Sequence, residues 1–177
     1  AVDEPRLSAE LLLAHALGCT RMQLYTRYDT TPDPAALAAI REMVRQRAEH
    51  VPVAYLIGRS QFFSLDLAVT RDVLIPRPDT ETLVEQIIQR ARQAPGWETP
   101  HILDLGTGSG AITLALAKNL PSAQIVATDV SAKALAVARQ NAELHQLSDR
   151  IAFLEGDLLA ALAIHSDDPR PAAQPPM

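Results

Sequence analysis

The chain has 177 residues, of which 47% are hydrophobic and 21% are charged, and its formal net charge at pH 7 is −5. This length fits one domain, or one small domain together with part of another. An acidic balance is a poor match for a broad phosphate-binding surface, so we expect no direct nucleic-acid partner.

The histidines and the cysteine do not form a metal-binding pattern. Cys19 is the only cysteine, and the five histidines include no His-x-x-x-His pair. We therefore predict no metal site and no internal disulfide. No stretch approaches the ~18–20 apolar residues of a membrane-spanning helix, and the N-terminus lacks a secretion pattern. We expect a cytoplasmic protein without a membrane partner.

Residues 1–58 are predicted to form a small helical domain, because apolar residues recur there at helical spacing. In the third of its helices, Leu37, Ile40 and Val44 are expected to form the buried face. The helices expected in this domain span residues 6–17, 21–27, 34–49 and 53–57.

The apolar spacing changes over residues 59–78. Phe63, Leu65, Leu67 and Val69 alternate with residues that are mostly polar or small. Alternation with a period of two predicts β-structure, here a hairpin or linker between two domains.

A second domain is predicted over residues 79–164. Two nearby prolines exclude a regular helix before it, and Asp79 or Thr80 is expected to cap the helix that follows them. Strand and helix patterns then alternate, which predicts a parallel α/β sheet with right-handed crossovers. The expected strands span 102–105, 124–130 and 151–157, and the helices between them 111–119 and 131–145. Residues 165–177 are expected to be an irregular, proline-rich tail.

A glycine-rich loop follows the first strand of this sheet. Gly106, Gly108 and Gly110 lie between the strand and the next helix. Glycine permits positive φ and close approach of a ligand, and a helix start offers unpaired N–H donors. Asp129 lies nineteen residues after Gly110, close to the ~20 expected for an acid that binds ribose hydroxyls. The loop therefore predicts a nucleotide site.

Two classes of nucleotide fit this loop. The spacing of Gly106, Gly108 and Ala111 matches the dinucleotide fingerprint, so an NAD-dependent reductase is one alternative. However, the Asp104 carboxylate would repel a pyrophosphate and attract the ammonium group of S-adenosylmethionine. Asp157, at the end of the third strand, could accept a hydrogen bond from an adenine amino group. Acids at three strand ends favour a cationic nucleoside.

Several segments resemble a known family. DLGTGSG, ATDVS and EGD resemble the motifs of class I S-adenosylmethionine-dependent methyltransferases, whose sheet is doubly wound and Rossmann-like. VLIPRPDTE, together with RLSAELLLAHALG and PVAYLIG, resembles the HemK/PrmC family of protein-(glutamine-N5) methyltransferases. The resemblance covers about residues 5–162 and would make residues 79–164 the first half of such a sheet.

The resemblance implies a cofactor, a substrate and a set of site residues. The cofactor would be S-adenosyl-L-methionine, and the substrate the glutamine of the Gly-Gly-Gln motif in peptide chain release factors, docked by the N-terminal helices. Asp129 would hold the ribose, and Asp157 and Leu158 would border the adenine. The residues implied for the methionine part are Asp104, Gly106, Thr107, Gly108, Ser109 and Gly110. Those implied to shape the pocket lie in Pro76–Glu81, namely Pro76, Arg77, Thr80 and Glu81.

The catalytic motif of that family, Asn-Pro-Pro-Tyr, is not found in the sequence. The nearest segment is QPPM at 174–177, in which Gln174 is the candidate to replace the Asn amide. We therefore expect a truncated or altered ending and a chain with impaired activity. A further alternative is a non-catalytic interaction fragment, because a three-stranded piece of sheet leaves an open hydrophobic edge.

Overall fold

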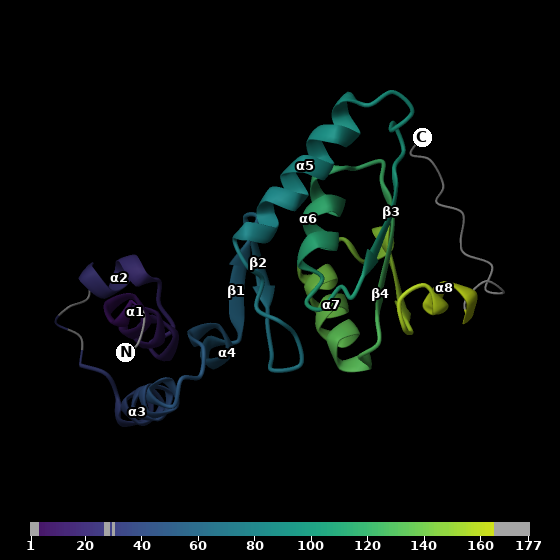
Figure 1. The fold of residues 1–177 in the computed structure, drawn as a ribbon. Helices are drawn as coiled ribbons and strands as arrows, with labels where there is room; N and C mark the ends of the chain where they lie inside the picture. Colours follow the sequence, from purple (N-terminus) through teal and green to yellow (C-terminus); the bar gives the residue numbers. More distant parts are fainter. Residues whose placement is uncertain (1–3, 27–28, 30, 165–177) are drawn as a thin grey trace. The chain divides into compact units, whose positions relative to one another are not determined.

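A computed structural model describes residues 4–26, 29 and 31–164 of the chain (Figure 1). The chain divides into two compact units, Ala1–Arg59 and Ser60–Met177. The predicted tail and Gln174 lie outside the described residues. Among the helices that the structure describes, none is both long and apolar enough to cross a membrane.

The first unit is built from helices. Helix α1 packs against the other three helices and buries Leu12 and Ala14. Asp33 caps α3, since its carboxylate accepts a hydrogen bond from the Ala36 N–H at 2.8 Å. The helices are α1 (Pro5–Ala16), α2 (Arg21–Thr26), α3 (Pro34–Ala48) and α4 (Val53–Ile57).

Helix α3 does not bury the face that the sequence predicted. Leu37 and Val44 are 36% and 50% exposed, whereas Ala36, Ile40 and Met43 are partly buried. The two faces differ by one residue at each end, and both have helical spacing. Apolar residues at neighbouring positions make the two faces indistinguishable by periodicity alone.

The segment predicted as a hairpin or linker forms a two-stranded sheet, with β1 (Arg59–Phe62) joined to β2 (Leu65–Ala68). Phe63 and Ser64 have φ of 48° and 60°, as a two-residue hairpin turn requires. Phe63 therefore lies in the turn and not in the strand predicted for it. Phe62, Leu65 and Leu67 are buried in the core of the second unit, so this segment is part of that core.

The rest of the second unit is a three-stranded parallel sheet with helices. The strand order is β3-β4-β5, and Leu103 pairs with Val126, which pairs with Ala152. The parallel α/β architecture predicted from the alternation is confirmed. The elements are α5 (Asp79–Gln93), β3 (His101–Leu105), α6 (Ala111–Asn119), β4 (Gln124–Asp129), α7 (Ala132–Leu144), the 3₁₀ turn Ser148–Arg150, β5 (Ile151–Glu155) and α8 (Ala160–Ile164).

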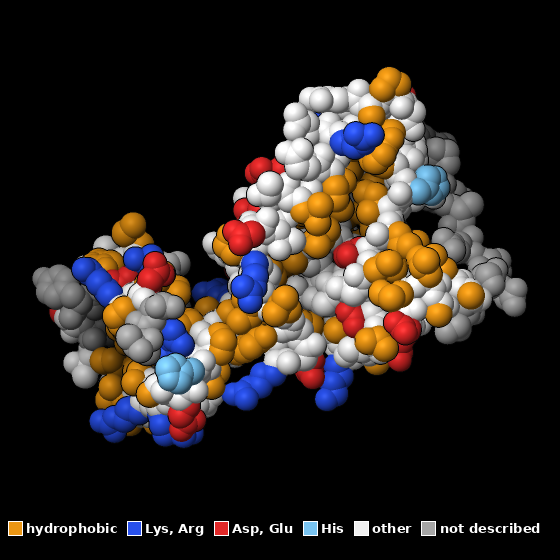
Figure 2. All heavy atoms as spheres, in the orientation of Figure 1, with side chains coloured by type: hydrophobic (Ala, Val, Ile, Leu, Met, Phe, Trp, Pro, Cys, Tyr) orange, Lys and Arg blue, Asp and Glu red, His pale blue; other side chains and the backbone are white. Residues whose placement is uncertain are grey.

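The two faces of this sheet are covered differently. Figure 1 shows α5, α6 and α7 on the same side of the strands. Ile125 and Ile151, which are in register, belong to the core on that side. On the other face Leu103 and Leu105 are 38% and 39% exposed, and Figure 2 shows hydrophobic side chains at the surface of this unit. In sheets of this kind, ligands bind at the loops that follow the carboxyl ends of the strands.

Candidate binding site at the glycine loop

The loop between β3 and α6 depends on its glycines. Gly106, Gly108 and Gly110 have φ of 76°, 56° and 80°, a region that L-residues rarely adopt. A Cβ on Gly106 or Gly108 would meet open space, whereas one on Gly110 would lie 3.3 Å from the Ala138 Cβ of α7. One side of the loop is therefore open, and the other packs closely on α7.

The backbone donors of the loop are largely bonded within the protein. The N–H groups of Gly106 and Thr107 donate to one carbonyl oxygen of β4 (2.9 Å each), and that of Gly110 donates to the Thr107 carbonyl (2.9 Å). The Gly108 N–H donates to Asp129 Oδ2 at 2.9 Å. Phosphate sites at such loops use free N–H groups as their ligands. This loop is therefore a poor cradle for a pyrophosphate.

Asp104 belongs to β3, and its side chain is hydrogen-bonded to the loop and to the first turn of α6. Its Oδ2 accepts hydrogen bonds from the hydroxyls of Thr107 (2.8 Å) and Thr113 (2.6 Å). Thr113 is fully buried, so the carboxylate is held in a fixed place. Among the described residues, Asp104 Oδ1 takes part in no hydrogen bond, and it is open to a further donor. A half-buried carboxylate in this position favours a cationic ligand.

Asp129 lies at the end of β4 and holds two backbone segments. Its Oδ2 accepts from the Gly108 N–H and its Oδ1 from the Ser131 N–H, both at 2.9 Å. A carboxylate has about four lone-pair sites, so two remain for other donors such as hydroxyl groups. Asp104 pairs with Ala127, two residues before Asp129. Since alternate residues share a face of a strand, both acids lie on the same face.

The turn after β5 is hydrogen-bonded to the end of β4, but the site residues predicted in this turn are exposed. The Gly156 N–H donates to the Asp129 carbonyl at 3.0 Å. Asp157 is exposed, and Leu158 is 59% exposed. The structure thus joins Asp104, Asp129 and the loop in one network, and leaves Asp157 and Leu158 at its margin.

The segment predicted to shape the pocket, Pro76–Glu81, leads into α5 and ends within its first turn. Pro76 and Thr80 are half-buried, and Arg77 is exposed. Glu81 is half-buried, and its Oε1 accepts a hydrogen bond from the Phe63 N–H of the hairpin turn at 2.8 Å. The observed role of Glu81 is therefore to fasten the hairpin to α5.

The predicted cap of α5 is wrong. The helix begins at Asp79 itself, its N-cap residue is Pro78, and no side chain caps it. Pro78 has φ −55° and ψ −37°, which is already helical geometry. Because proline fixes φ near this value, Pro78 can lead directly into the helix. The helix therefore begins at Asp79, and not after a cap at Asp79 or Thr80.

One buried polar residue of this region was missed by the sequence analysis. Asn141 of α7 is 0% exposed, and its Nδ2 donates to the Ser109 carbonyl of the glycine loop at 2.9 Å. The available signal was an amide within the apolar face of α7, next to Ala138 and Ala142. A buried polar side chain requires partners, but the sequence does not say which ones.

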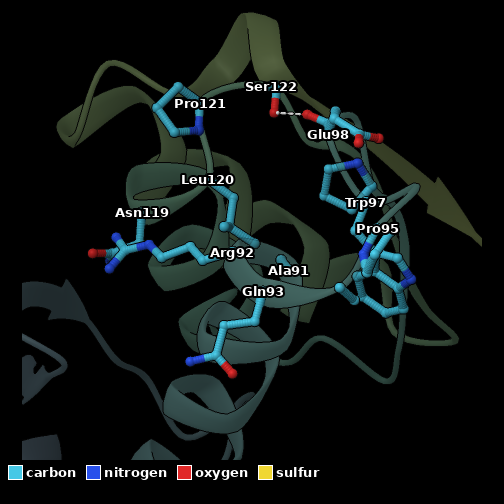
Figure 3. A pocket seen from close by; sticks show the side chains of 12 residues that line it. Ala91, Arg92, Gln93, Pro95, Trp97, Glu98, Asn119, Leu120, Pro121 and Ser122 are labelled. Carbon is cyan, nitrogen blue, oxygen red and sulfur yellow. Dashed lines mark hydrogen bonds between the residues drawn. The ribbon is translucent and has the colours of Figure 1, made fainter.

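An open groove of about 650 Å³ lies elsewhere in the second unit (Figure 3). It is lined by the end of α5, the connection that carries Trp97 and Glu98, and the residues after α6. The Ser122 hydroxyl donates to the Glu98 carbonyl there, at 2.5 Å. The groove includes Asn119, at the opposite end of α6 from the glycine loop. It is therefore separate from the candidate site.

Comparisons with known proteins match both parts of the chain. Residues 1–58 match the family described as the PrmC N-terminal domain, and residues 98–169 match a methyltransferase domain. The release factor glutamine methyltransferase of Rhodopirellula baltica is 48% identical over 164 residues, which are 90% of this chain and 54% of the relative. That of Xylella fastidiosa strain 9a5c is 50% identical over 157 residues, 89% of this chain and 56% of the relative.

Solved structures of methyltransferases are partly similar. A SAM-dependent methyltransferase from Agrobacterium tumefaciens has a TM-score of 0.49 and 18% identity, covering 60% of this chain and 34% of that one. The N-terminal domain of human METTL16, in complex with SAH, has a TM-score of 0.46 and 24% identity, covering 62% and 43%.

The parallel sheet, its glycine loop and the matched domain place the second unit among the Rossmann-like methyltransferases. Together with the match to the PrmC N-terminal domain, the curated relatives make the chain similar, over about 90% of its length, to release factor glutamine methyltransferases, the HemK/PrmC family. The chain spans about half the length of the curated relatives that it matches.

Proposed function

We propose that this chain carries the S-adenosylmethionine-binding part of a methyltransferase that modifies the glutamine of release factors, in the cytoplasm. The observation that supports the cofactor most strongly is the glycine loop whose N–H groups are bonded to protein acceptors, with Asp104 beneath it. A phosphate-bearing dinucleotide would find few free donors and a nearby negative charge. S-adenosylmethionine carries an ammonium and a sulfonium and has no phosphate.

In this proposal, each residue of the network contacts a different part of the cofactor. Asp104 Oδ1 would accept from the ammonium group, and the open side of the loop at Gly106 and Gly108 would face the methionine part. The two remaining lone-pair sites of Asp129 suit the two ribose hydroxyls. Asp157 and Leu158 are at the margin, where an adenine would extend from the ribose.

The proposed reaction moves a methyl group to the side-chain nitrogen of glutamine. The glutamine amide nitrogen would attack the sulfonium methyl group as the carbon–sulfur bond breaks. S-adenosylhomocysteine would leave as a neutral thioether, and the methylated nitrogen would lose one proton to water. An amide nitrogen is a weak nucleophile because its lone pair is delocalised, so the protein must position it and stabilise the developing charge. The sequence contains no Asn-Pro-Pro-Tyr segment for that task. We therefore expect this chain to bind the cofactor and to transfer little methyl.

The helical unit is proposed to dock the release factor. Its support is the match of residues 1–58 to the PrmC N-terminal domain and the names of the close relatives. Binding of a release factor to the chain, measured by surface plasmon resonance, tests this part. Equal binding by a chain that lacks residues 1–58 would contradict it.

Titration calorimetry tests the cofactor proposal. We expect S-adenosylmethionine and its demethylated product to bind one site, and NADH to give no binding heat. Asp129→Asn should weaken the affinity for S-adenosylmethionine by about tenfold or more, because a charged hydrogen-bond acceptor is lost. Asp149→Asn, at an exposed aspartate of the 3₁₀ turn, is the matched control and should not change it. Binding of NADH, or equal affinity in the two variants, would contradict the proposal.

A further inference from the structure

Asn141 is a buried amide that joins three segments of the second unit. Its Oδ1 accepts from the Ala68 N–H at 2.7 Å, and its Nδ2 donates to the Ala68 carbonyl at 3.0 Å. The same Nδ2 donates to the Ser109 carbonyl at 2.9 Å. Both amide protons are thus used, one toward β2 and one toward the glycine loop.

The surrounding contacts make this a junction and not an isolated pair. Ala138, one turn earlier on α7, lies where a Cβ on Gly110 would approach to 3.3 Å. His145, one turn later, bonds through Nε2 to the Asp66 carbonyl at 2.8 Å. One face of α7 therefore contacts the loop at Ala138, both the loop and β2 at Asn141, and β2 alone at His145.

We propose that Asn141 is a positioning residue, which holds the glycine loop in its ligand-binding shape by fastening it to the hairpin. The inference rests on the proposed cofactor role of the loop. The Ser109 carbonyl is buried, and without the Asn141 donor the peptide unit between Ser109 and Gly110 keeps only the bond from the Gly110 N–H to the Thr107 carbonyl. Because Gly110 already has a φ of 80°, this peptide unit can rotate with little steric resistance. Such a rotation would misplace the donors and carboxylates around the cofactor.

Asn141→Asp is the sharpest variant, because it keeps the size of the side chain and replaces the two donors by a carboxylate. That carboxylate would face the carbonyl oxygens of Ala68 and Ser109. His145→Ala is the matched control, since it removes a hydrogen bond between the same helix and the same strand without touching the loop. We expect Asn141→Asp to weaken the affinity for S-adenosylmethionine by about tenfold or more, and His145→Ala by about twofold or less.

The loop itself can be observed without any ligand. In ¹H–¹⁵N spectra of the 177-residue chain, the amide signals of Gly108 and Gly110 should shift in Asn141→Asp and remain in place in His145→Ala. A general loss of stability would not separate these two variants in this way. Unchanged loop signals together with unchanged affinity in Asn141→Asp would overturn the inference. Failure of the unaltered chain to bind S-adenosylmethionine would instead overturn the proposed function, while the loop signals still decide the role of Asn141.

If Asn141→Asp does not fold, two other measurements test the inference. Asn141→Ser keeps a hydroxyl that is too short to reach both partners, and we expect it to shift the same loop signals. In the unaltered chain, the side-chain amide signal of Asn141 should move when S-adenosylmethionine is added. A side-chain signal that stays fixed at saturation would contradict the proposed coupling of Asn141 to the loop.

Discussion

The two units of the chain are stabilised in different ways. Among the described residues of the first unit, only Ser8, Leu12 and Ala14 are buried, whereas the second unit has a continuous apolar core between its sheet, its hairpin and α5–α7. In the first unit Glu10 instead accepts hydrogen bonds from Arg6, Arg21 and Tyr25. The helical unit therefore depends on local helix signals and polar contacts, and the second unit on packing between distant parts of the chain.

The largest effect is expected from a cavity in the core of the second unit. Leu116 of α6 is 0% exposed, and Leu116→Ala should lower the free energy of unfolding by about 3 kcal/mol. Leu103→Ala, on the open face of the sheet where the side chain is 38% exposed, is the control and should cost about 1 kcal/mol or less. Urea unfolding followed by the fluorescence of Trp97 measures both. Equal losses of unfolding free energy in the two variants would contradict the difference between the helix-covered side of the sheet and its open face.

The glycine loop should show the next largest effect. Gly110→Ala places a Cβ 3.3 Å from Ala138 and from Leu114, in addition to the strain of a positive φ, so we expect a loss of about 2–3 kcal/mol. Gly96→Ala has a similar φ of 83° and no atom within 4 Å of the added Cβ, and should cost about 1 kcal/mol. The same unfolding experiment compares them. If the two variants are equally stable, the close contact with α7 is not a real constraint.

In the helical unit, the polar cluster predicts a dependence on pH. The pKa of Glu10 is lowered from 4.5 to about 2, first by the Tyr25 hydroxyl and then by Arg21 and Arg6. A lowered pKa in the folded state means that the stabilisation is present above pH 4.5 and is lost as the pH falls toward 2. Urea midpoints of the unaltered chain and of Glu10→Gln should therefore converge over this range. A difference that stays constant from pH 6 to about pH 2 would contradict this assignment.

The smallest effect is expected from an exposed pair of the same unit. The pKa of Glu42 is also lowered to about 2, first by a hydrogen bond from Arg45. However, the side chains of Arg45 and Glu42 are 58% and 50% exposed, whereas that of Glu10 is 14% exposed. Solvent and salt weaken such exposed pairs, so Glu42→Gln should leave the urea midpoint unchanged. A loss as large as that of Glu10→Gln would remove the distinction between the two clusters.

Features that depend on neighbouring residues were predictable from the sequence. The glycine loop, the three strands and the Ser131 cap of α7, which accepts from the Ala134 N–H at 3.2 Å, all have local signals. The buried face of α3 and the turn at Phe63 were predicted wrongly, because apolar residues there occupy adjacent positions. Periodicity alone does not choose between such neighbours.

The partners of the site residues were not predictable. The positions of Asp104 and Asp129 follow from the ends of parallel strands, but the bonds to Thr113 and to the Gly108 N–H depend on how α6 and the loop fold back. Asn141 reaches Ala68 from a distance of 73 residues along the chain, and no local pattern encodes such a contact. The cofactor roles of these residues stay a prediction.

The most direct test of this account is a crystal structure of the chain with S-adenosylhomocysteine. The account predicts electron density along the open side of Gly106 and Gly108, with an amine next to Asp104 and ribose hydroxyls within hydrogen-bond distance of Asp129. Density in the groove beside Trp97, or a bound molecule that contacts neither aspartate, would contradict it.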